Sequence, residues 1–501
     1  MKKALANMFW RMGDKLSLGY DAGDSQRVRR DLGWGRNTPK DEDRMVGAGD
    51  STRETIRLKS YDLRRNNAVV SGVCERLASF AVGGTGLNPQ ARTSNTDWNR
   101  SAEQWWAEWS KVCDARGRID MRMLQWLAIS MRPTHGGMYL QLLDNGQIMP
   151  IECERIRRPS SKDSVQKAYP DGVKVAGNGK PVAYWVHDRD ANGSFSQRHA
   201  ERPVQAGYMV PVISPPWRLD QVREIPDLAP IVPHLQDIHE MNTHTLNTAK
   251  VQAMIVAALK KNGGMGLNGL PRGSNSATNT VGTRQTFKFD WGQVLEMFPG
   301  EELDMGQSAT PNAEHIPYIK MQLMLCASAL NRPYEFFTLD FQNADFSRMK
   351  AILLMCNRAS RDDQAWLVSY MMKRLWNWRI AKAIKEKELP PAPIETRNGM
   401  NVSEWYKVEW QGPEEPWLDR QEAQQADVLE IQAGLNTFSR ASKRRGGDFE
   451  DTLREKAQDQ MTINRVAQEY GLDPQQLVML QIPGQQAPAT GNGDGNAKPN
   501  I

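Results

Sequence analysis

The chain has 501 residues, with 64 Lys and Arg against 59 Asp and Glu, and a formal net charge of +5. This near-neutral balance excludes a protein that clamps DNA through a strongly basic face, because phosphate contacts of that kind need many positive side chains. A chain of this length predicts two to four packed subregions instead of one core.

Nothing in the sequence indicates a membrane segment, a disulfide framework or a metal site. The longest run of consecutive apolar residues, Ala253 to Leu259, is far shorter than the roughly 20 residues that span a bilayer. The N-terminal stretch has neither a sustained apolar core nor a small-residue cleavage site, so we expect no signal peptide. The five cysteines are scattered singly, which is typical of reduced thiols in a cytosolic setting.

The first hundred residues predict an arm followed by helices. Residues 1–50 are polar and lack an apolar period, so we expect a partly mobile N-terminal arm. One helical pattern runs from Ser51 to about Val82 and ends at a glycine-rich segment. The next, Asp97 to Cys113, places Trp105 and Trp109 on one helical face. Their neighbours are acidic, whereas aromatics that stack on bases need interleaved basic residues, so we expect these tryptophans to lie in the core.

Short extended runs broken by turns follow from Gly137. The pattern predicts strands at residues 138–143, 147–152, 172–188 and 208–213. Asp144-Asn145-Gly146 and Asn178-Gly179 are hairpin signals between them.

The remaining chain is mainly helical by pattern. A helix is predicted over residues 227–260, with Asp227 as its N-cap and two prolines in its first turns. A flexible Gly/Ser/Asn-rich loop follows from residue 261. A second helix is predicted over 311–330 and a polar loop over 331–347. A long helix then runs from Asp345 to Glu388, and Asp345 is expected to cap it.

Several stretches resemble, in chain order, the motifs of lambda-type portal proteins of tailed phages. The chain reads GKPVAYWV where the family has G-x-P-V-A-Y-x-V, and RLDQVREIPDLAP, GQVLEMFPGEELDM and WQGPEEPWLD are similar to further family motifs. In the loop NRPYEFFTLDFQNADFSRMK and the helix before it, the shared residues are Ala327, Leu330, Tyr334, Glu335, Asp340, Phe341, Asn343 and Ser347. Departures from the family are Gln342, Asp345, Phe346, Arg348 and Lys350. The resemblance covers about Tyr20 to Leu477.

The resemblance implies an α+β portal fold that is helix-rich and ring-forming. Its expected parts are an N-terminal arm (1–50), a mixed α/β wing (51–226), a stem helix (227–260), a small β clip (261–310), a second stem helix (311–330), a tunnel loop (331–347), a long helix returning to the wing (348–410), a helical crown (411–480) and a disordered tail (481–501).

The function implied by the resemblance is structural. Twelve copies would form a ring at the portal vertex of the virion capsid, after synthesis in the host cytoplasm. Double-stranded DNA would pass through the ring without sequence specificity, inward in packaging and outward in ejection. The implied partners are further copies of the chain, the major capsid protein, the terminase large subunit and the head-tail adaptor, with no cofactor, metal, catalytic residue or membrane.

The residues expected to face DNA lie in the tunnel loop and on the stem. The tunnel-loop residues are Asn331, Phe336, Phe337, Phe341, Gln342, Asn343, Asp345 and Arg348, and the three phenylalanines are expected to pack between loops of neighbouring subunits. Candidate channel-lining lysines are Lys250, Lys260, Lys261 and Lys320, although the outer surface of the stem is an equal alternative for them. An ordinary buried helix–helix connector is the alternative for the loop.

Enzyme interpretations have weaker support. No G-x-x-x-x-G-K-[ST] motif is present, so a separate ATPase must power DNA movement. His234, His239 and His244 are spaced by five residues, so successive rings diverge by about 140° around a helix instead of sharing a zinc-binding face. Structural histidines are therefore predicted. A metal-dependent phage nuclease and a capsid scaffolding protein without a channel stay open as alternatives.

Overall fold

The computed structural model describes residues 50–160, 163–189, 201–256, 315–342, 345–397, 400–414 and 420–471. The chain divides into two compact units, Met1–Pro413 and Glu414–Ile501. Residues 1–49 of the predicted arm and the whole predicted clip and tail lie outside the described residues.

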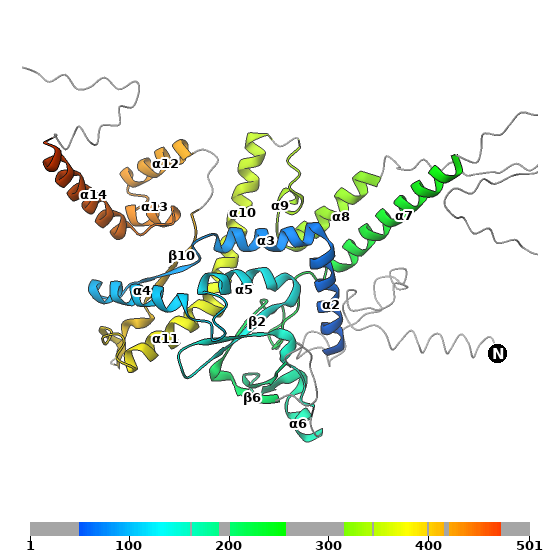
Figure 1. The fold of residues 1–501 in the computed structure, drawn as a ribbon, viewed down its shortest axis with the longest axis horizontal. Helices are drawn as coiled ribbons and strands as arrows, with labels where there is room; N and C mark the ends of the chain where they lie inside the picture. The colour runs from blue at the N-terminus through cyan, green and yellow to red at the C-terminus, as the bar shows by residue number, and fades with distance from the viewer. Residues whose placement is uncertain are drawn as a thin grey trace, which may run out of the picture. The chain divides into compact units, whose positions relative to one another are not determined.

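The first unit combines helices with small antiparallel sheets (Figure 1). Its α-helices are α2 (Asp50–Asn66), α3 (Ala68–Val82), α4 (Thr96–Lys111), α5 (Met121–His135), α6 (Asp163–Ala168), α7 (Val232–Val256), α8 (His315–Ala329), α9 (Tyr334–Thr338), α10 (Phe346–Leu367) and α11 (Lys373–Lys385). A π-helical turn, η7 (Val368–Met372), joins α10 to α11.

The helix predicted over residues 51–82 is two helices, because the chain breaks at Asn67. This residue has an extended backbone (φ −111°, ψ 113°). Its side chain accepts hydrogen bonds from the backbone N–H groups of Val69 and Val70, at 3.0 and 3.2 Å. Asn67 therefore caps α3, since an asparagine side chain satisfies amides that lack a partner in the first turn. The apolar period runs across the break and does not reveal it.

All four predicted extended runs form strands. The strands are β1 (Asn88–Ala91), β2 (Gly137–Leu142), β3 (Ile148–Glu152), β4 (Val173–Val175), β5 (Pro181–His187), β6 (Glu201–Gln205), β7 (Met209–Ile213), β8 (Ile394–Arg397), β9 (Met400–Ser403) and β10 (Val408–Gln411). Two three-stranded antiparallel sheets have the orders β3-β2-β7 and β4-β5-β6, and two strand pairs are β1-β10 and β8-β9. Gly146 and Gly179 have positive φ angles of 82° in the two predicted hairpin turns.

A glycine pair makes the tight passage from α5 into β2. Gly136 ends α5 in the left-handed conformation (φ 81°), and Gly137 follows with φ 130°. A Cβ atom on Gly137 would lie 2.2 Å from the carbonyl oxygen of Val212 on β7. The sheet can therefore pair directly against the end of the helix only because this position has no side chain.

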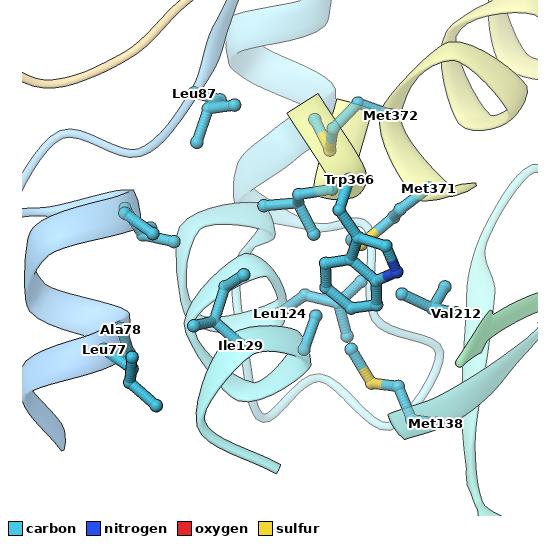
Figure 2. Packing of buried hydrophobic residues seen from close by; sticks show 14 of the residues in the cluster. Leu77, Ala78, Leu87, Leu124, Ile129, Met138, Val212, Trp366, Met371 and Met372 are labelled. Carbon is cyan, nitrogen blue, oxygen red and sulfur yellow. The ribbon is translucent and has the colours of Figure 1, made fainter. Parts of the chain in front are cut away.

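The main core lies where α3, α5, β2, β7 and the α10–η7–α11 helix meet. Figure 2 shows Trp366 and Met371 from the long helix packed beside Met138 and Val212 from the sheet. A second cluster, which includes Tyr139, contains buried side chains from both three-stranded sheets. The helix predicted from Asp345 to Glu388 is confirmed, with a π turn inside it.

The tryptophans of α4 are confirmed as core residues. Trp106 and Trp109 are buried, and Trp105 stacks on Trp109 with ring centroids 6.4 Å apart. Trp106 also packs at 5.2 Å from Trp376 of α11. Trp376 is fully buried and donates its indole N–H to the carbonyl of Trp405 at 2.7 Å. This aromatic cluster joins α4 to the long helix.

The second unit contains α12 (Arg420–Gln432), α13 (Phe438–Arg444) and α14 (Phe449–Tyr470). Asp427 is buried between Arg444 and Arg445, at 3.3 and 3.1 Å. Phe438 and Phe449 stack at 5.5 Å and join α13 to α14. The first unit ends three residues after Trp410, which pairs with Pro89 in the β1-β10 ladder.

Candidate functional site

Helices α7 and α8, the two segments predicted to form a stem, lie side by side (Figure 1). Nδ1 of His234 lies 2.8 Å from Oε1 of Gln322, and Oγ1 of Thr245 lies 3.3 Å from Nε2 of His315. These contacts run in opposite directions along the two helices, so the pair is antiparallel. His234 thus has the structural role predicted for it.

The other two histidines of α7, His239 and His244, are exposed. Over the ranges that the structure describes, no three metal-ligating side chains lie close enough together to hold an ion. None of the helices described there is both long and apolar enough to cross a membrane.

Asp227 is not the N-cap that its sequence position predicts. Helix α7 begins five residues later, at Val232. Asp227 instead accepts a hydrogen bond from Nε of Arg132 at 2.7 Å and another from Oγ of Ser214 at 2.9 Å. The prediction was wrong because the carboxylate finds a guanidinium from α5, a partner distant in sequence.

The predicted tunnel loop contains a short helix. Helix α8 ends at Ala329, Asn331 adopts the left-handed region (φ 53°), and α9 follows over Tyr334–Thr338. Leu339 closes α9, also in the left-handed region (φ 59°), and donates its backbone N–H to the carbonyl of Glu335 at 2.8 Å. The irregular part of the loop is therefore shorter than residues 331–347.

The three phenylalanines of the loop differ in burial. Phe336 and Phe337 are 4% and 1% exposed, and Phe336 packs edge-on against Phe80 of α3 at 5.3 Å between ring centroids. Phe341 is 44% exposed. The expectation that all three pack between neighbouring subunits is corrected for Phe336 and Phe337, because the core of their own chain already encloses them.

The end of the loop is organised by two polar contacts. Asp345 caps α10, as predicted, by accepting a hydrogen bond from the backbone N–H of Arg348 at 2.7 Å. The side chain of Arg348 in turn lies 2.7 Å from Glu335, which is buried at the first turn of α9. Gln342 is exposed, and its backbone N–H donates to Asp340 at 3.2 Å. Asn343 lies outside the described residues.

Two of the four candidate lysines can be placed. Lys250 is exposed near the end of α7. Lys320 on α8 forms an ion pair with Asp340 of the loop, at 3.1 Å between Nζ and Oδ2. Lys260 and Lys261 lie outside the described residues.

The base of the loop belongs to a chain of alternating charges that the sequence does not reveal. Arg332 pairs with Oδ2 of Asp363 on α10, and Oδ1 of Asp363 accepts a hydrogen bond from Arg132 at 2.8 Å. Arg132 also contacts Asp227, so the order is Asp227–Arg132–Asp363–Arg332. Burial disfavours the charged form of Arg132, but the two carboxylates outweigh it and raise its pKa above the usual value. By sequence alone, Arg132 and Asp363 are ordinary helix charges.

A second buried network fixes α2 to the sheets. Arg223 is fully buried and pairs with Glu224 at 2.7 Å, and Arg53 of α2 pairs with Asp171. Burial opposes the charge on Glu224, yet Arg223 lowers the pKa of this carboxyl to about 2. Tyr139 donates its hydroxyl to the same carboxylate at 2.8 Å. The network joins α2 to the sheets through buried charges, each of which has a partner of opposite sign.

Sequential helices and small antiparallel sheets make this an α+β protein. The family model for "Phage portal protein, lambda family" matches residues 29–364, well over half of the chain. The chain therefore belongs to the lambda family of phage portal proteins. It is also 20% identical over 481 residues to a "Probable portal protein" of Halomonas phage phiHAP-1, a similarity that covers 88% of this chain and 86% of that protein.

Proposed function

We propose that this portal protein forms a ring of about twelve copies at one vertex of the capsid. Double-stranded DNA enters through the ring during packaging and leaves through it during ejection. The ring also docks the terminase large subunit and the head-tail adaptor, and contacts the major capsid protein. The observation that carries the proposal is the family match across residues 29–364, which spans the two three-stranded sheets, both stem candidates and the loop.

The described elements support an assignment of parts. We take the sheets with α2–α6 as the wing, the antiparallel pair α7 and α8 as the stem, and residues 331–347 as the tunnel loop. Residues 348–410 return to the wing, and the second compact unit supplies the crown. The loop leaves the end of α8 and leads directly into the long helix, so a load on its tip would reach both.

The proposed channel role requires weak contact with DNA. A duplex that slides through a ring must exchange its phosphate contacts easily, so these contacts have to be few and spread around the bore. Lys320 suits this requirement because Asp340 partly offsets its charge. The exposed part of the loop also carries Phe341 and Gln342, neither of which attracts phosphate strongly.

We further propose that the protein has no catalytic activity of its own and that a separate ATPase drives packaging. A highly purified preparation should hydrolyse neither ATP nor DNA in the presence of divalent ions. Hydrolysis that disappears on substitution of His239, or of the adjacent Glu240 as the acidic residue beside the three histidines, would instead identify a metal-dependent enzyme.

Imaging and mass photometry of the purified full chain test the assembly. We expect rings with a central hole at raised protein concentration. A protein that stays monomeric at high concentration, with no rings in any image, would contradict the proposal. Solid assemblies without a hole would favour a scaffolding protein.

Shortening the loop tests the channel role separately. Deletion of residues 342–344 should leave folding and ring formation intact while impairing genome packaging or retention in infected cells. Normal packaging and retention by the shortened protein would show that the loop has no role in the channel.

A further inference from the structure

We infer that Arg332 and Asp363 are positioning residues that fix the base of the loop to the segment before α7, so that residues 339–342 yield when DNA passes while the base stays in place. This inference rests on the proposed function, and it separates an anchored base, residues 331–338, from a yielding tip, residues 339–342.

The first support is the continuity of the charge chain. Arg332 begins the loop, and its guanidinium pairs with Asp363 and lies 3.4 Å from the carbonyls of Cys356 and Ala359, all on α10. The second oxygen of Asp363 holds Arg132 of α5 at 2.8 Å. Four charged groups thus connect the loop with the segment before α7.

The other end of the charge network, at Arg132 and Asp227, is equally well anchored. Arg132 holds Asp227 at 2.7 Å, five residues before α7 begins, and its guanidinium lies 4.8 Å from the ring centre of Trp366. Ser214, next to the end of β7, donates a hydrogen bond to the other oxygen of Asp227 at 2.9 Å. Buried and partly buried ion pairs are screened little by salt, and loss of one partner leaves an uncompensated charge. The network therefore resists a shift of any single member.

A second set of contacts holds α9 independently of this charge network. Arg76 of α3 donates hydrogen bonds to the carbonyls of Phe336 and Phe337, at 2.9 and 2.8 Å. These two carbonyls lie at the end of a five-residue helix, where backbone acceptors lack partners within the helix. The buried Phe336 and Phe337 side chains add packing against α3. The base is thus held from α3, α5 and α10.

The tip has no comparable anchoring among the described residues. Leu339 is 54% exposed, and Phe341 and Gln342 are exposed as well. Its one ion pair to the stem in the described structure, between Asp340 and Lys320, is open to water and so is weakened by salt. The boundary between base and tip falls at Leu339, where the positive φ ends α9.

Hydrogen exchange of the assembled full-length ring tests the coupling. Arg332→Gln should accelerate exchange of the α9 amides, Phe337 and Leu339 among them, by about tenfold through local opening, with little change in β2. Asp227→Asn should accelerate the same amides, although the side chain of Asp227 does not contact the loop. Arg332→Lys keeps the charge and should show a smaller acceleration than Arg332→Gln.

Glu75→Gln is the matched control, because it removes an exposed ion pair with Arg64 outside the network. It should leave exchange in α9 unchanged. If Arg332→Gln accelerates α9 while Asp227→Asn does not, the loop is anchored only locally and the coupling is refuted. Equal exchange in all variants refutes the anchor itself. If Arg332→Gln fails to form rings, Asp227→Asn and Arg332→Lys replace it: faster exchange of α9 in both supports the coupling, and unchanged exchange in both refutes it.

Failure of the inference can be distinguished from failure of the proposed function. Exchange in purified rings needs no DNA passage, whereas deletion of residues 342–344 is scored by packaging. Coupled exchange with normal packaging by the shortened protein would keep the anchor and reject the channel role. Impaired packaging by the shortened protein, together with exchange that is not coupled, would keep the channel role and reject the anchor.

Discussion

Lys320 on α8 and Asp340 in the loop form an ion pair that joins the proposed stem to the tip of the proposed tunnel loop, at 3.1 Å. The hydrogen bond to Asp340 raises the pKa of Lys320, and Lys320 lowers the pKa of Asp340. A lysine predicted from its position to contact DNA thus has a partner in its own chain.

We expect the loop tip to become more mobile as salt is raised, because counterions weaken an exposed ion pair. Exchange of the Gln342 amide should increase between low salt and about 1 M salt in the unmodified ring. Lys320→Gln should give fast exchange at all salt concentrations. Lys250→Gln, which alters an exposed lysine elsewhere on the stem, should retain the salt response. An equal loss of the response in both variants would show that the Lys320–Asp340 pair does not cause it.

Removal of the cap on α10 should destabilise the first turn of that helix. Asp345→Ala leaves the backbone N–H of Arg348 without its acceptor and should lower the free energy of unfolding by about 1 kcal/mol. Asp345→Ser keeps an oxygen acceptor and should recover most of the loss. Thermal unfolding and exchange of the first-turn amides measure both variants, and equal stability of Ala and Ser would argue against capping.

The tryptophan cluster should be the most sensitive part of the core. Trp376→Ala removes a fully buried indole at the junction of α4, α11 and β10, and we expect a loss of about 3–5 kcal/mol. Trp376→Phe retains much of the volume but leaves the Trp405 carbonyl without its donor, so its loss should be smaller. Trp217→Ala, at an exposed position, is the control and should change stability little.

Stability should fall as the pH drops below about 6.5, in part because of His135. Burial, followed by the nearby Arg64 and Arg57, lowers the pKa of His135 to about 3. The unfolded chain binds a proton near pH 6.5 whereas the folded protein does not, so each pH unit below that value costs at most about 1.4 kcal/mol. The loss ends only when the folded histidine itself is protonated near pH 3.

His135→Gln should flatten this dependence between pH 5 and pH 7. That window avoids the titration of Glu224. The pKa of its carboxyl is lowered to about 2, so its contribution to stability is lost only as the pH falls below the ordinary carboxyl pKa. His239→Gln, at an exposed position on α7, should keep the slope of the unmodified protein. The free energy of unfolding measured across the window tests this prediction. If its pH dependence is unchanged in His135→Gln, other groups cause the dependence.

Local patterns in the sequence predicted most of the regular elements. Alternating runs and the Asp144-Asn145-Gly146 and Asn178-Gly179 turns indicated the hairpins because strand period and turn chemistry are encoded over a few residues. Asp345 was identified as a cap for the same reason. The break at Asn67 was missed, because an asparagine inside an apolar period looks the same whether it faces solvent or caps a helix.

Family membership was also decided by the sequence, since the family model and the ordered motifs both depend on residue identity along the chain. The anchoring of the loop was decided by the tertiary structure alone. Arg76, Arg132, Asp363 and Arg332 come from four separate segments, and nothing in their neighbours distinguishes them from solvated charges. Their pairing exists only after α3, α5 and α10 pack together, because burial removes water as the competing partner and leaves each charge to be satisfied by another.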